Sequence, residues 1–514
     1  MALSRLIVED AGQARETPLR ARPDETVAQA LFRHGWLQNR PLCAGLGRCG
    51  HCRVRFAGRT PEAGADELEA LPPEEIGNGW RLACRHLVGE NGWRVQIDSA
   101  PSGALTPQPR CSSPEAVALD IGTTQLKWAV QCQEQVDIGG IFNPQMGAGA
   151  EVVSRLHWAL NSPQDQAFLA DMVWKRLGAL FEVASEFAAP VCLVGNPVMT
   201  GILAGWDLSP LTRPPYVLPV QDDSPVLGSP PVHVYIPPVL GSFVGPDVSA
   251  GLCALFAQNP SLAFPFLYID LGTNAELVLA VDATHWVATS LPLGPALEGV
   301  GLDCGTVFSE QAWSRFALGP AGLSGEPAQQ FPAGLSGSGV LSLLAQLKRA
   351  SLLDGEGHWQ APETPWASRV AKALEMKQGE LRFGLAPGVW LSSHDVEEVL
   401  KLKAIFNLGV SSLLQSAGLD FIHCRQVHLA GSISRVVAEE DLFELGFFPR
   451  FWRGRVLGHG NLALDGGLLL AQQKTWREWI AERAAQVRLV ELARHTGGPH
   501  GFTRAMRFDF VVPK

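Results

Sequence analysis

The sequence lacks any uncharged apolar run of eighteen or more residues. Long apolar candidates such as the stretch from Phe266 to Val281 are interrupted by charge, here by Asp270 and Glu276. Because a transmembrane helix needs about 20 largely apolar residues, we expect none in this chain. The N-terminal stretch MALSRLIVEDAGQARETP also lacks the apolar segment and cleavage site of a signal peptide. We therefore expect a cytoplasmic protein.

An excess of positive charge is missing as well, since the formal net charge is −10. Nucleic-acid binding requires a basic face, so this balance disfavours nucleic acid as the main partner. Short repeats are absent too. With 514 residues, of which 46% are hydrophobic and 18% charged, the chain can form sizeable cores in two to four units.

The first hundred residues have the pattern of a small β-rich unit. Residues 3–10, 51–58 and 92–99 alternate as strands do, and residues 25–35 have the pattern of a helix with Leu31 and Phe32 facing inward. Residues 101–116 are rich in Pro and Ser, which predicts a semi-extended linker.

Beyond the linker, strand and helix patterns alternate. Residues 117–130 and 266–281 each predict a strand, a Gly turn and a second strand, and the first turn, DIGTT, is echoed by DLGTN in the second. Long helical patterns occupy residues 165–187 and 396–418. Alternating strands and helices favour an α/β architecture with mixed sheets.

Four of the ten cysteines fall in the first hundred residues, in PLCAGLGRCGHCRVRF and RLACRH. A [2Fe–2S] cluster commonly takes three thiolates from one loop and a fourth from a distant strand. Gly45, Gly47 and Gly50 supply the backbone freedom with which such a loop wraps a cluster. The predicted metal ligands are Cys43, Cys49, Cys52 and Cys84.

Other metal sites fit this pattern less well. A structural zinc site more often shows two C-x2-C pairs, and only Cys49 and Cys52 form one. A Rieske centre needs two His ligands, and we interpret His51 and His86 as surface or supporting residues instead. The remaining, scattered cysteines are expected to be buried small apolar residues.

The two D-x-G-T segments suit phosphate binding. A Gly turn between apolar strands lets backbone N–H groups approach a phosphate, and hydroxyl or amide groups beside it donate further hydrogen bonds. Asp120 and Asp270, the candidate catalytic residues, can hold Mg²⁺ through water or position an attacking water. A third Gly turn, in LAGSIS, suits contact with an adenosine. The turn residues concerned are Gly122, Thr123, Thr124, Gly272, Thr273, Asn274, Gly431 and Ser432. Lys127 either reaches a phosphate or is a solvated strand lysine.

The three turns resemble the phosphate-1, phosphate-2 and adenosine motifs of the actin–sugar kinase–Hsp70 (ASKHA) superfamily. Over nearly its whole length, the chain also resembles the reductive activators of corrinoid proteins. Family-like blocks include CAGLGRCGHC, RLAC, NPQMGAGAEVVSRL, VGNPVMTGILAG, GSFVGPDVSAGL, GPALEG, SGSG and GNLALDGG. Through the SGSG block, the resemblance adds Gly337, Ser338 and Gly339 to the nucleotide-binding candidates.

The resemblance implies the domain order. A β-grasp [2Fe–2S] ferredoxin-type domain would occupy residues 1–100 and a linker residues 101–116. A middle RNase H-like domain would follow over residues 117–205, and a C-terminal ASKHA-like domain would fill residues 206–514.

The resemblance also implies the activity, which is ATP-dependent, one-electron reduction of an inactive Co(II) corrinoid to Co(I) through the cluster. The cofactors would be a [2Fe–2S] cluster, ATP and Mg²⁺. The partners would be a corrinoid protein or cobalamin-dependent methyltransferase and an electron donor, namely a ferredoxin, flavodoxin or reductase. A homodimer is the state that the family suggests, and neither nucleic acid nor membrane is an expected partner.

Three alternatives come from other classes. The chain could donate electrons to another low-potential metalloenzyme, although ATP-driven activators of that kind lack a separate ferredoxin domain. A small-molecule kinase with a redox-sensing domain would need a base, for which Asp303 and Asp395 are candidates. A non-enzymatic, chaperone-like regulator ranks last, because no peptide-binding β domain is recognisable.

Overall fold

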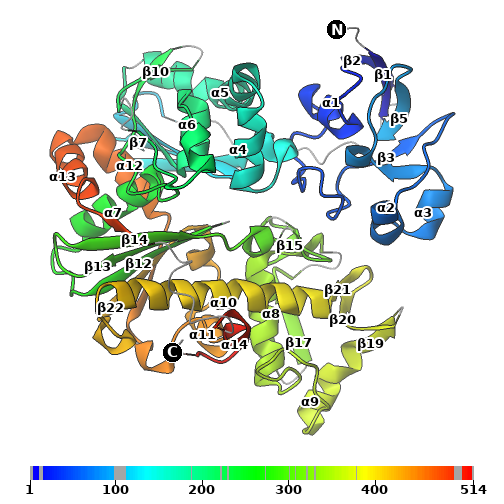
Figure 1. Ribbon diagram of the computed structural model, residues 1–514. Coiled ribbons are helices and arrows are strands. Elements are labelled where there is room, and N and C mark those ends of the chain that lie inside the picture. Colours follow the sequence, from blue (N-terminus) through cyan, green and yellow to red (C-terminus); the bar gives the residue numbers. More distant parts are fainter. Residues whose placement is uncertain are drawn as a thin grey trace.

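The fold is seen in a computed structural model (Figure 1). It describes residues 4–10, 15–97, 111–186, 188–219, 223–228, 231–272, 274–299, 301–306, 308–319, 322–328, 332–377, 379–490 and 501–511. The N-terminal unit, drawn in blue, lies beside two larger lobes that are each built on a mixed sheet.

The N-terminal unit is a five-stranded sheet in the order β2-β1-β5-β3-β4 with one main helix packed on it. In this sheet β1 pairs antiparallel with β2 and parallel with β5, which is the β-grasp arrangement that we expected. A capping box at Thr26 begins α1, which buries Leu31 and Phe32 completely. The elements are β1 (Ser4–Asp10), β2 (Arg15–Ala21), α1 (Val27–Arg33), β3 (Arg53–Phe56), α2 (Ala65–Ala70), α3 (Pro73–Gly77), β4 (Trp80–Leu82), η1 (Ala83–Arg85) and β5 (Trp93–Ile97).

The middle lobe contains a six-stranded sheet in the order β10-β11-β9-β6-β7-β8. Its first strand, β6, pairs antiparallel with β7 and parallel with β9, as in an RNase H-like fold. The elements are β6 (Ala116–Ile121), β7 (Gln125–Cys132), β8 (Gln135–Phe142), η2 (Pro144–Ala148), α4 (Val152–Leu160), α5 (Pro163–Glu186), β9 (Val191–Gly195), α6 (Pro197–Ala204), η3 (Ser209–Thr212), β10 (Val226–Leu227), β11 (Val232–Tyr235) and α7 (Pro246–Gln258).

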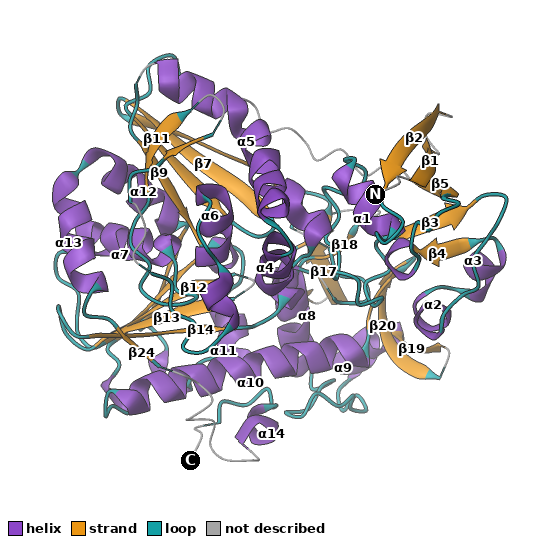
Figure 2. Ribbon diagram, turned by 45° about the horizontal axis from the view of Figure 1, so that its top comes forward, coloured by secondary structure: helices purple, strands orange, loops and turns teal. Residues whose placement is uncertain are grey.

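The C-terminal lobe repeats this design with the sheet order β23-β22-β12-β13-β14-β24. Its sheet strands and most of its α-helices are β12 (Phe266–Leu271), β13 (Ala275–Ala280), β14 (Trp286–Leu291), α8 (Gly337–Arg349), α10 (Ser393–Ser416), β22 (Gln426–Ala430), α11 (Glu439–Glu444), β23 (Val456–Gly460), α12 (Leu462–Gln472), α13 (Lys474–Ala484), β24 (Arg488–Leu489) and α14 (Gly501–Ala505). Figure 2 shows α10 lying along the sheet. Short elements complete the lobe: η4 (Pro295–Glu298), β15 (Ala312–Trp313), β16 (Arg315–Gly319), β17 (Gly322–Glu326), β18 (Gly334–Leu335), α9 (Pro365–Val370), η5 (Ala371–Ala373), β19 (Leu374–Lys377), β20 (Glu380–Ala386), β21 (Val389–Leu391), η6 (Phe421–His423), η7 (Ser432–Arg435) and η8 (Arg450–Trp452).

Two helices join the lobes. Residues of α7 and α12 share one buried apolar cluster with residues of β6 and β12, so this core reaches both sheets. The α12 helix packs against α7, β6 and β9. The two lobes therefore meet through packed helices, with the ends of their first strands directed toward the space between them.

The expected division between middle and C-terminal domains lay near residue 205. The structure pairs strands from beyond that point with the middle sheet, because β11 lies parallel to β9 and β10 pairs with β11. Pairing between strands that are far apart in the sequence cannot be read from a local sequence pattern. We accordingly propose that the division falls after α7, between residues 258 and 265.

The scattered cysteines divide into three kinds. Cys192, Cys253 and Cys424 are buried, as expected, whereas Cys304 is partly exposed, contrary to the expectation. The expectation is wrong for Cys111 and Cys132, which form a disulfide. Cys111 lies just before β6 and Cys132 ends the antiparallel partner strand β7, which brings the two thiols together. Residues 101–110 of the expected linker lie outside the described residues, and within those described no helix is both long and apolar enough to cross a membrane.

Candidate functional site

A cavity of about 480 Å³ lies between the two large sheets. It collects residues from both D-x-G-T hairpins, from the start of α8 and from the LAGSIS turn. Ten of the residues predicted from the sequence line it: Asp120, Gly122, Thr123, Thr124, Asp270, Gly272, Asn274, Gly337, Ser338 and Gly431. Thr273 and the side chain of Ser432 are predicted site groups that lie outside the described residues.

The first hairpin places its loop at the carboxyl end of β6. The Gly122 amide donates to the Gln125 carbonyl at 3.0 Å, which closes a tight turn. One Asp120 oxygen accepts a hydrogen bond from Nδ2 of Asn461, the N-cap of α12, at 3.0 Å. Lys127 faces Asp120 across the strand pair and lines the same cavity.

The second hairpin has a turn that is one residue shorter, in which the Gly272 amide donates to the Asn274 carbonyl at 2.8 Å. Gly431, at the end of β22, has φ +90°, and a methyl group there would lie 2.6 Å from Asp270 Oδ1. Only glycine therefore combines this left-handed backbone with so close an approach to the carboxylate.

The SGSG segment forms the first turn of α8. Ser336 is the N-cap, and its hydroxyl accepts from the Gly339 amide at 3.2 Å. Gly337 lies directly against the Leu297 carbonyl in the GPALEG segment, where no side chain fits. The free N–H groups of a helix N-terminus favour an anion, so this end of α8 suits a phosphate. Gly339 is buried behind this turn against Trp313 and does not line the cavity.

Sequence reasoning missed three carboxylates of the cavity, Asp247, Glu276 and Asp465. Asp247, in the first turn of α7, and Glu276, on β13, face the same space as Asp270. Burial, together with the neighbouring carboxylates, raises the pKa of Asp247 and of Glu276 well above the ordinary range. Burial and the charge of Asp120 raise the pKa of Asp270 to about 7, against an opposing effect of Lys127. The quoted block GSFVGPDVSAGL contains Asp247 and was the available signal.

The four predicted metal ligands gather at one edge of the N-terminal unit. Cys43, Cys49 and Cys52 lie on one loop, and Cys84 comes from η1. The loop has the left-handed backbone that its glycines predicted, with φ +90°, +75° and +67° at Gly45, Gly47 and Gly50, and also φ +51° at Ala44. Leu46, at the tip, is 60% exposed, so the loop is at the surface.

Side chains around the loop brace it. Arg85 donates to the carbonyls of Gly45 and Leu46, both at 3.0 Å. The rings of the two histidines make supporting contacts, His51 with the Pro41 carbonyl and His86 with Glu67 Oε1, each at 2.9 Å. These contacts engage one ring nitrogen of each histidine with protein groups.

The thiols are arranged as two pairs, Cys43 with Cys49 and Cys52 with Cys84. Hydrogen bonding from the Cys49 thiol, together with the amides of residues 47–49, lowers the pKa of Cys43 well below its ordinary value. Hydrogen bonding to Cys43 and Cys84, respectively, and burial raise the pKa of Cys49 and of Cys52. Among the described residues, no set of three or more Cys, His, Asp or Glu has the arrangement of an assembled metal site.

The base candidates of the kinase alternative are engaged elsewhere. Asp395 forms a capping box with Ser392 at the start of α10 and accepts the Asp303 amide at 2.8 Å. Neither aspartate lines the cavity between the sheets. Their positions match a structural role at a helix N-terminus.

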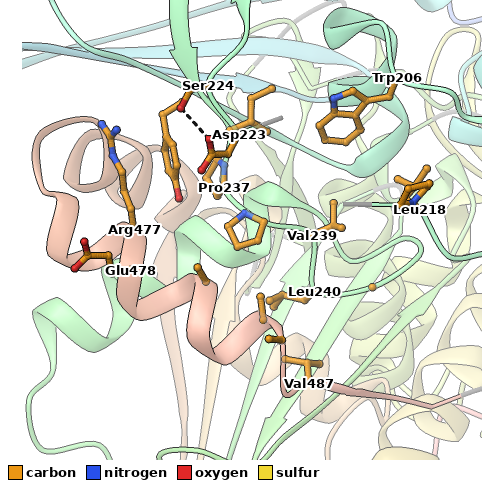
Figure 3. Close-up of a pocket in the computed structure, with 18 of the residues that line it drawn as sticks. Trp206, Leu218, Asp223, Ser224, Pro237, Val239, Leu240, Arg477, Glu478 and Val487 are labelled. Carbon is orange, nitrogen blue, oxygen red and sulfur yellow. Dashed lines mark hydrogen bonds between the residues drawn. The ribbon is translucent and has the colours of Figure 1, made fainter. Parts of the chain in front are cut away.

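A second cavity, of about 970 Å³, lies away from the predicted site residues (Figure 3). Apolar side chains such as Trp206, Leu218 and Val239 face α13, from which Arg477 and Glu478 project. The Arg477 guanidinium lies over the Tyr235 ring at 4.3 Å. None of the predicted site residues belongs to this cavity.

Two mixed sheets with five strands in the same order, whose first hairpins and a Gly turn meet at a shared cavity, define a protein of the ASKHA class. Residues 265–510 match the sequence model described as the C-terminal domain of RACo, the ASKHA domain. Residues 115–258 match that of the RACo middle region. The chain belongs to the RACo family, the reductive activators of corrinoid proteins, which confirms the resemblance seen in the sequence.

Individual relatives agree. The corrinoid activation enzyme RamQ of Eubacterium limosum is 25% identical over 395 residues, covering 70% of this chain and 64% of that protein. The Co(II) methylated amine-specific corrinoid protein reductase of Methanosarcina barkeri is 21% identical over 430 residues, covering 75% of this chain and 73% of that protein. A solved reductive activator for a corrinoid, iron–sulfur protein shares the fold, with a TM-score of 0.64 and 20% identity over 98% of this chain and 97% of that one.

Proposed function

We propose that this protein uses ATP to drive one-electron reduction of a corrinoid protein from Co(II) to Co(I), with the electron supplied through a [2Fe–2S] cluster. One observation carries the proposal. A single chain of the RACo family contains both a set of four cysteines and an ASKHA cavity that is lined by two glycine-turn hairpins. The names of RamQ and of the Methanosarcina barkeri reductase describe the same kind of activity.

The N-terminal loop suits a cluster with Cys43, Cys49, Cys52 and Cys84 as ligands. Backbone amides donate hydrogen bonds to the cysteine sulfurs. The amides of residues 47–49 donate to Cys43, the His51 amide donates to Cys49, and the Cys84 amide donates to Cys52. Amide hydrogen bonds stabilise thiolates and tune the potential of a bound cluster. When bound, a [2Fe–2S] centre of this kind supplies a single electron at a potential of about −400 mV.

The cavity between the lobes suits ATP with Mg²⁺. The two hairpin loops, through Thr123, Thr124 and Asn274, and the start of α8 would offer donors to phosphate oxygens. Asp120 and Asp270 would hold Mg²⁺ or orient a water, with Asp247 and Glu276 adding negative charge beside Asp270. Buried carboxylates this close repel one another, so a bound cation relieves a cost that the free protein carries.

ATP is needed because the electron must go uphill to reach Co(I). Each additional 59 mV or so of unfavourable potential costs about 1.4 kcal/mol for one electron. Nucleotide can alter the electron transfer only if it binds two arrangements of the lobes with different affinity. Packing of α7 and α12 across both sheets provides a contact through which the lobes can shift as units.

The partners follow from this activity. The acceptor would be a corrinoid protein or a cobalamin-dependent methyltransferase, and the donor a reduced ferredoxin, flavodoxin or reductase. A cytoplasmic location, a homodimeric state and independence from nucleic acid and membrane complete the proposal. The acidic net charge of −10 supports the exclusion of nucleic acid.

The direct test uses anaerobic protein reconstituted with iron and sulfide. With a reductant, ATP and a Co(II) corrinoid protein, we expect a [2Fe–2S] spectrum and the appearance of the Co(I) absorption band. The variant Cys84→Ser should lose both signals, whereas Cys304→Ser, at a partly exposed thiol outside both sites, should keep them. A protein with an intact cluster and bound ATP that reduces no corrinoid partner would contradict the proposed acceptor.

A further inference from the structure

The first glycine loop is held from behind by two buried side chains. The side chain of Asn143 donates from Nδ2 to the Gly122 carbonyl at 2.8 Å, and its backbone amide donates to the Thr124 carbonyl at 2.9 Å. Arg155 donates from Nη2 to the Thr123 carbonyl. Three consecutive carbonyls of the loop thus engage two residues, both of which are fully buried. Such contacts fix the peptide planes whose N–H groups would meet a phosphate.

The same two residues are tied to the segment that follows β8. Arg155 Nε donates to the Gly149 carbonyl at 2.9 Å, and its Nη1 lies 3.0 Å from the Met199 sulfur. Asn143 Oδ1 accepts from the Gln145 amide at 2.9 Å, which starts η2. Residues 143–150 therefore cannot move without disturbing the groups that hold the glycine loop.

This segment also carries the cysteine loop. The Leu42 amide donates to the Met146 carbonyl at 3.2 Å, and the Ala150 amide donates to the Leu42 carbonyl at 2.8 Å. Leu42 directly precedes Cys43. Both backbone groups of the residue beside the first cysteine are consequently bonded to the middle lobe.

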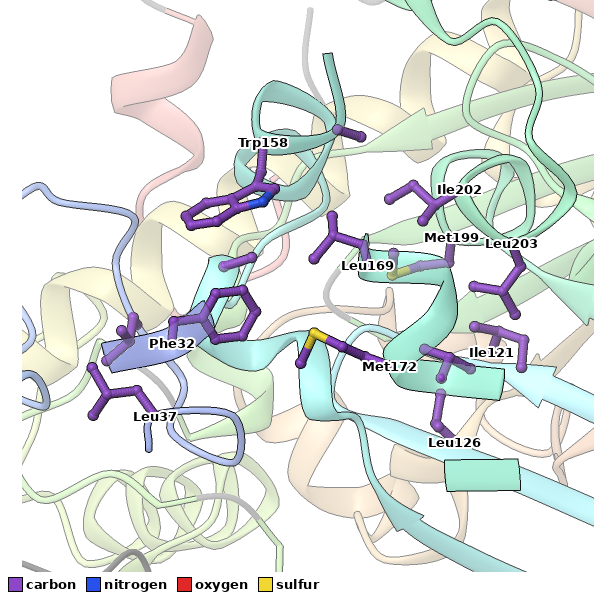
Figure 4. Close-up of a cluster of buried hydrophobic side chains, with 14 of the residues drawn as sticks. Phe32, Leu37, Ile121, Leu126, Trp158, Leu169, Met172, Met199, Ile202 and Leu203 are labelled. Carbon is purple, nitrogen blue, oxygen red and sulfur yellow. The ribbon is translucent and has the colours of Figure 1, made fainter. Parts of the chain in front are cut away.

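Apolar packing completes the junction (Figure 4). Phe32 of α1 meets Trp158 of α4 edge to face, with ring centroids 5.2 Å apart. Gly147 lies against the Phe32 ring and the Leu37 carbonyl, so that a methyl group there would overlap both. An ion pair between Arg33 and Asp165, at 2.8 Å, borders this contact.

We propose that Asn143 and Arg155 are positioning residues that couple the glycine loop to the docking of the cysteine-bearing unit. The inference rests on the proposed function, because it takes the cavity ligand to be a nucleotide. Docking of the N-terminal unit keeps residues 143–150 in place, which keeps the loop carbonyls engaged and the loop ready for phosphate. Coupling of two binding events is reciprocal, so weaker docking must weaken nucleotide binding, and bound nucleotide must strengthen docking.

The first test changes the junction at Gly147, which does not line the cavity. In the full chain with its cluster, Gly147→Ala should weaken the affinity for a non-hydrolysable ATP analogue by about fivefold or more, measured by titration calorimetry. The matched control is Gly178→Ala, on the same lobe, where an added methyl group meets open space. Equal affinities in the two variants would overturn the coupling alone. Wild-type protein that binds no adenine nucleotide would overturn the proposed function and this inference together.

The second test reads the coupling in the other direction. At saturating nucleotide, hydrogen exchange of the backbone amides of residues 42–46 in the wild type should slow by about fivefold or more. Asn143→Asp keeps the acceptor for the Gln145 amide but loses the donor to Gly122, so it should lose most of this slowing even when saturated. Asn161→Asp, at an exposed end of α4, should behave as the wild type. Full slowing in Asn143→Asp would contradict the proposal, since a merely structural residue would not affect a difference between two ligand states.

Discussion

The two large sheets place similar hairpins on opposite sides of one cavity, and they differ in charge. Asp120 ends β6 and faces Lys127 across the strand pair, whereas Asp270 ends β12 and faces Glu276. The first carboxylate accordingly has a cation opposite. The second has another acid, and Asp247 lies near it in the cavity.

The hairpins also differ in what supports them. Asn143 and Arg155 hold the carbonyls of the first loop and lead to the cysteine loop. The turn of the second loop is closed by its own backbone, and Gly431 packs on its aspartate. The first hairpin, which forms the first arm of the cavity, is therefore connected to the cysteine-bearing unit. The second hairpin, which forms the second arm, concentrates the negative charge that a divalent cation would neutralise. This contrast suggests different effects for matched substitutions on the two arms.

The largest effect is expected from the aspartates themselves. Asp120→Asn and Asp270→Asn should each lower the ATPase rate at saturating nucleotide by about a hundredfold, because each removes a charge that holds the metal or orients water. A phosphate-release assay with the corrinoid partner present measures the rate.

The control for these variants is Asp303→Asn, at an exposed site that does not line the cavity. It should keep the wild-type rate. If Asp303→Asn were the variant that lost activity, the kinase alternative would gain over the activator.

Next in size is the close approach of Gly431 to the second arm. Gly431→Ala should lower nucleotide affinity by about tenfold or more, since a methyl group cannot fit beside the Asp270 carboxylate at a left-handed backbone. Titration calorimetry measures the affinity.

Gly418→Ala separates the two causes. Gly418 has a similar φ of +68° but open space around it. This variant should lose about 1 kcal/mol of stability and no nucleotide affinity. Equal losses of affinity at both positions would mean that backbone strain alone is responsible.

A smaller effect is expected in the pH dependence of stability without nucleotide or metal. The folded-state pKa of Asp270 is raised to about 7, whereas the unfolded value is about 4. The folded state binds the extra proton, so this stability is complete below about pH 4 and is lost as pH rises through about 7. Asp270→Asn removes this pH dependence. The free energy of unfolding of Asp270→Asn minus that of the wild type should therefore be about 2 kcal/mol larger at pH 8 than at pH 5.

Chemical denaturation in a chelator at both pH values measures this difference. Asp120→Asn serves as the comparison from the first arm, where a lysine lies opposite the carboxylate. A gain of the same size in both variants would show that the arms do not differ in charge balance.

The smallest effect concerns that lysine. Lys127 lowers the pKa of Asp270 through its charge. Lys127→Gln should therefore move the pH midpoint of Mg²⁺–nucleotide binding upward, whereas Lys175→Gln, which removes an exposed ion pair on α5, should not. Nucleotide titrations across pH 6 to 9 detect the shift, and an unchanged midpoint would show that Lys127 is a solvated strand lysine without influence on the site.

Much of the fold followed from local patterns. Two-residue periodicity and glycine turns located β1, β6, β7, β12 and β13, and the cysteine spacing located a loop with the expected left-handed glycines. The apolar face of α1 was also a local pattern, as were the helical patterns that became α5 and α10. These features depend on backbone sterics and on burial of one face, both of which operate over a few neighbouring residues.

The pairing of distant strands and the meeting of distant side chains depended on the tertiary structure. The tertiary structure paired β11 with β9 beyond the expected boundary, brought Cys111 to Cys132, and directed Asp247 and Glu276 into the cavity. It also placed Gly339 behind the cavity wall and bonded Leu42 to the segment held by Asn143 and Arg155. The sequence by itself determined which groups could bind iron or phosphate, because that depends on residue type and local spacing. Only the tertiary structure decided which of them meet, because burial and hydrogen bonding between distant segments have no local pattern.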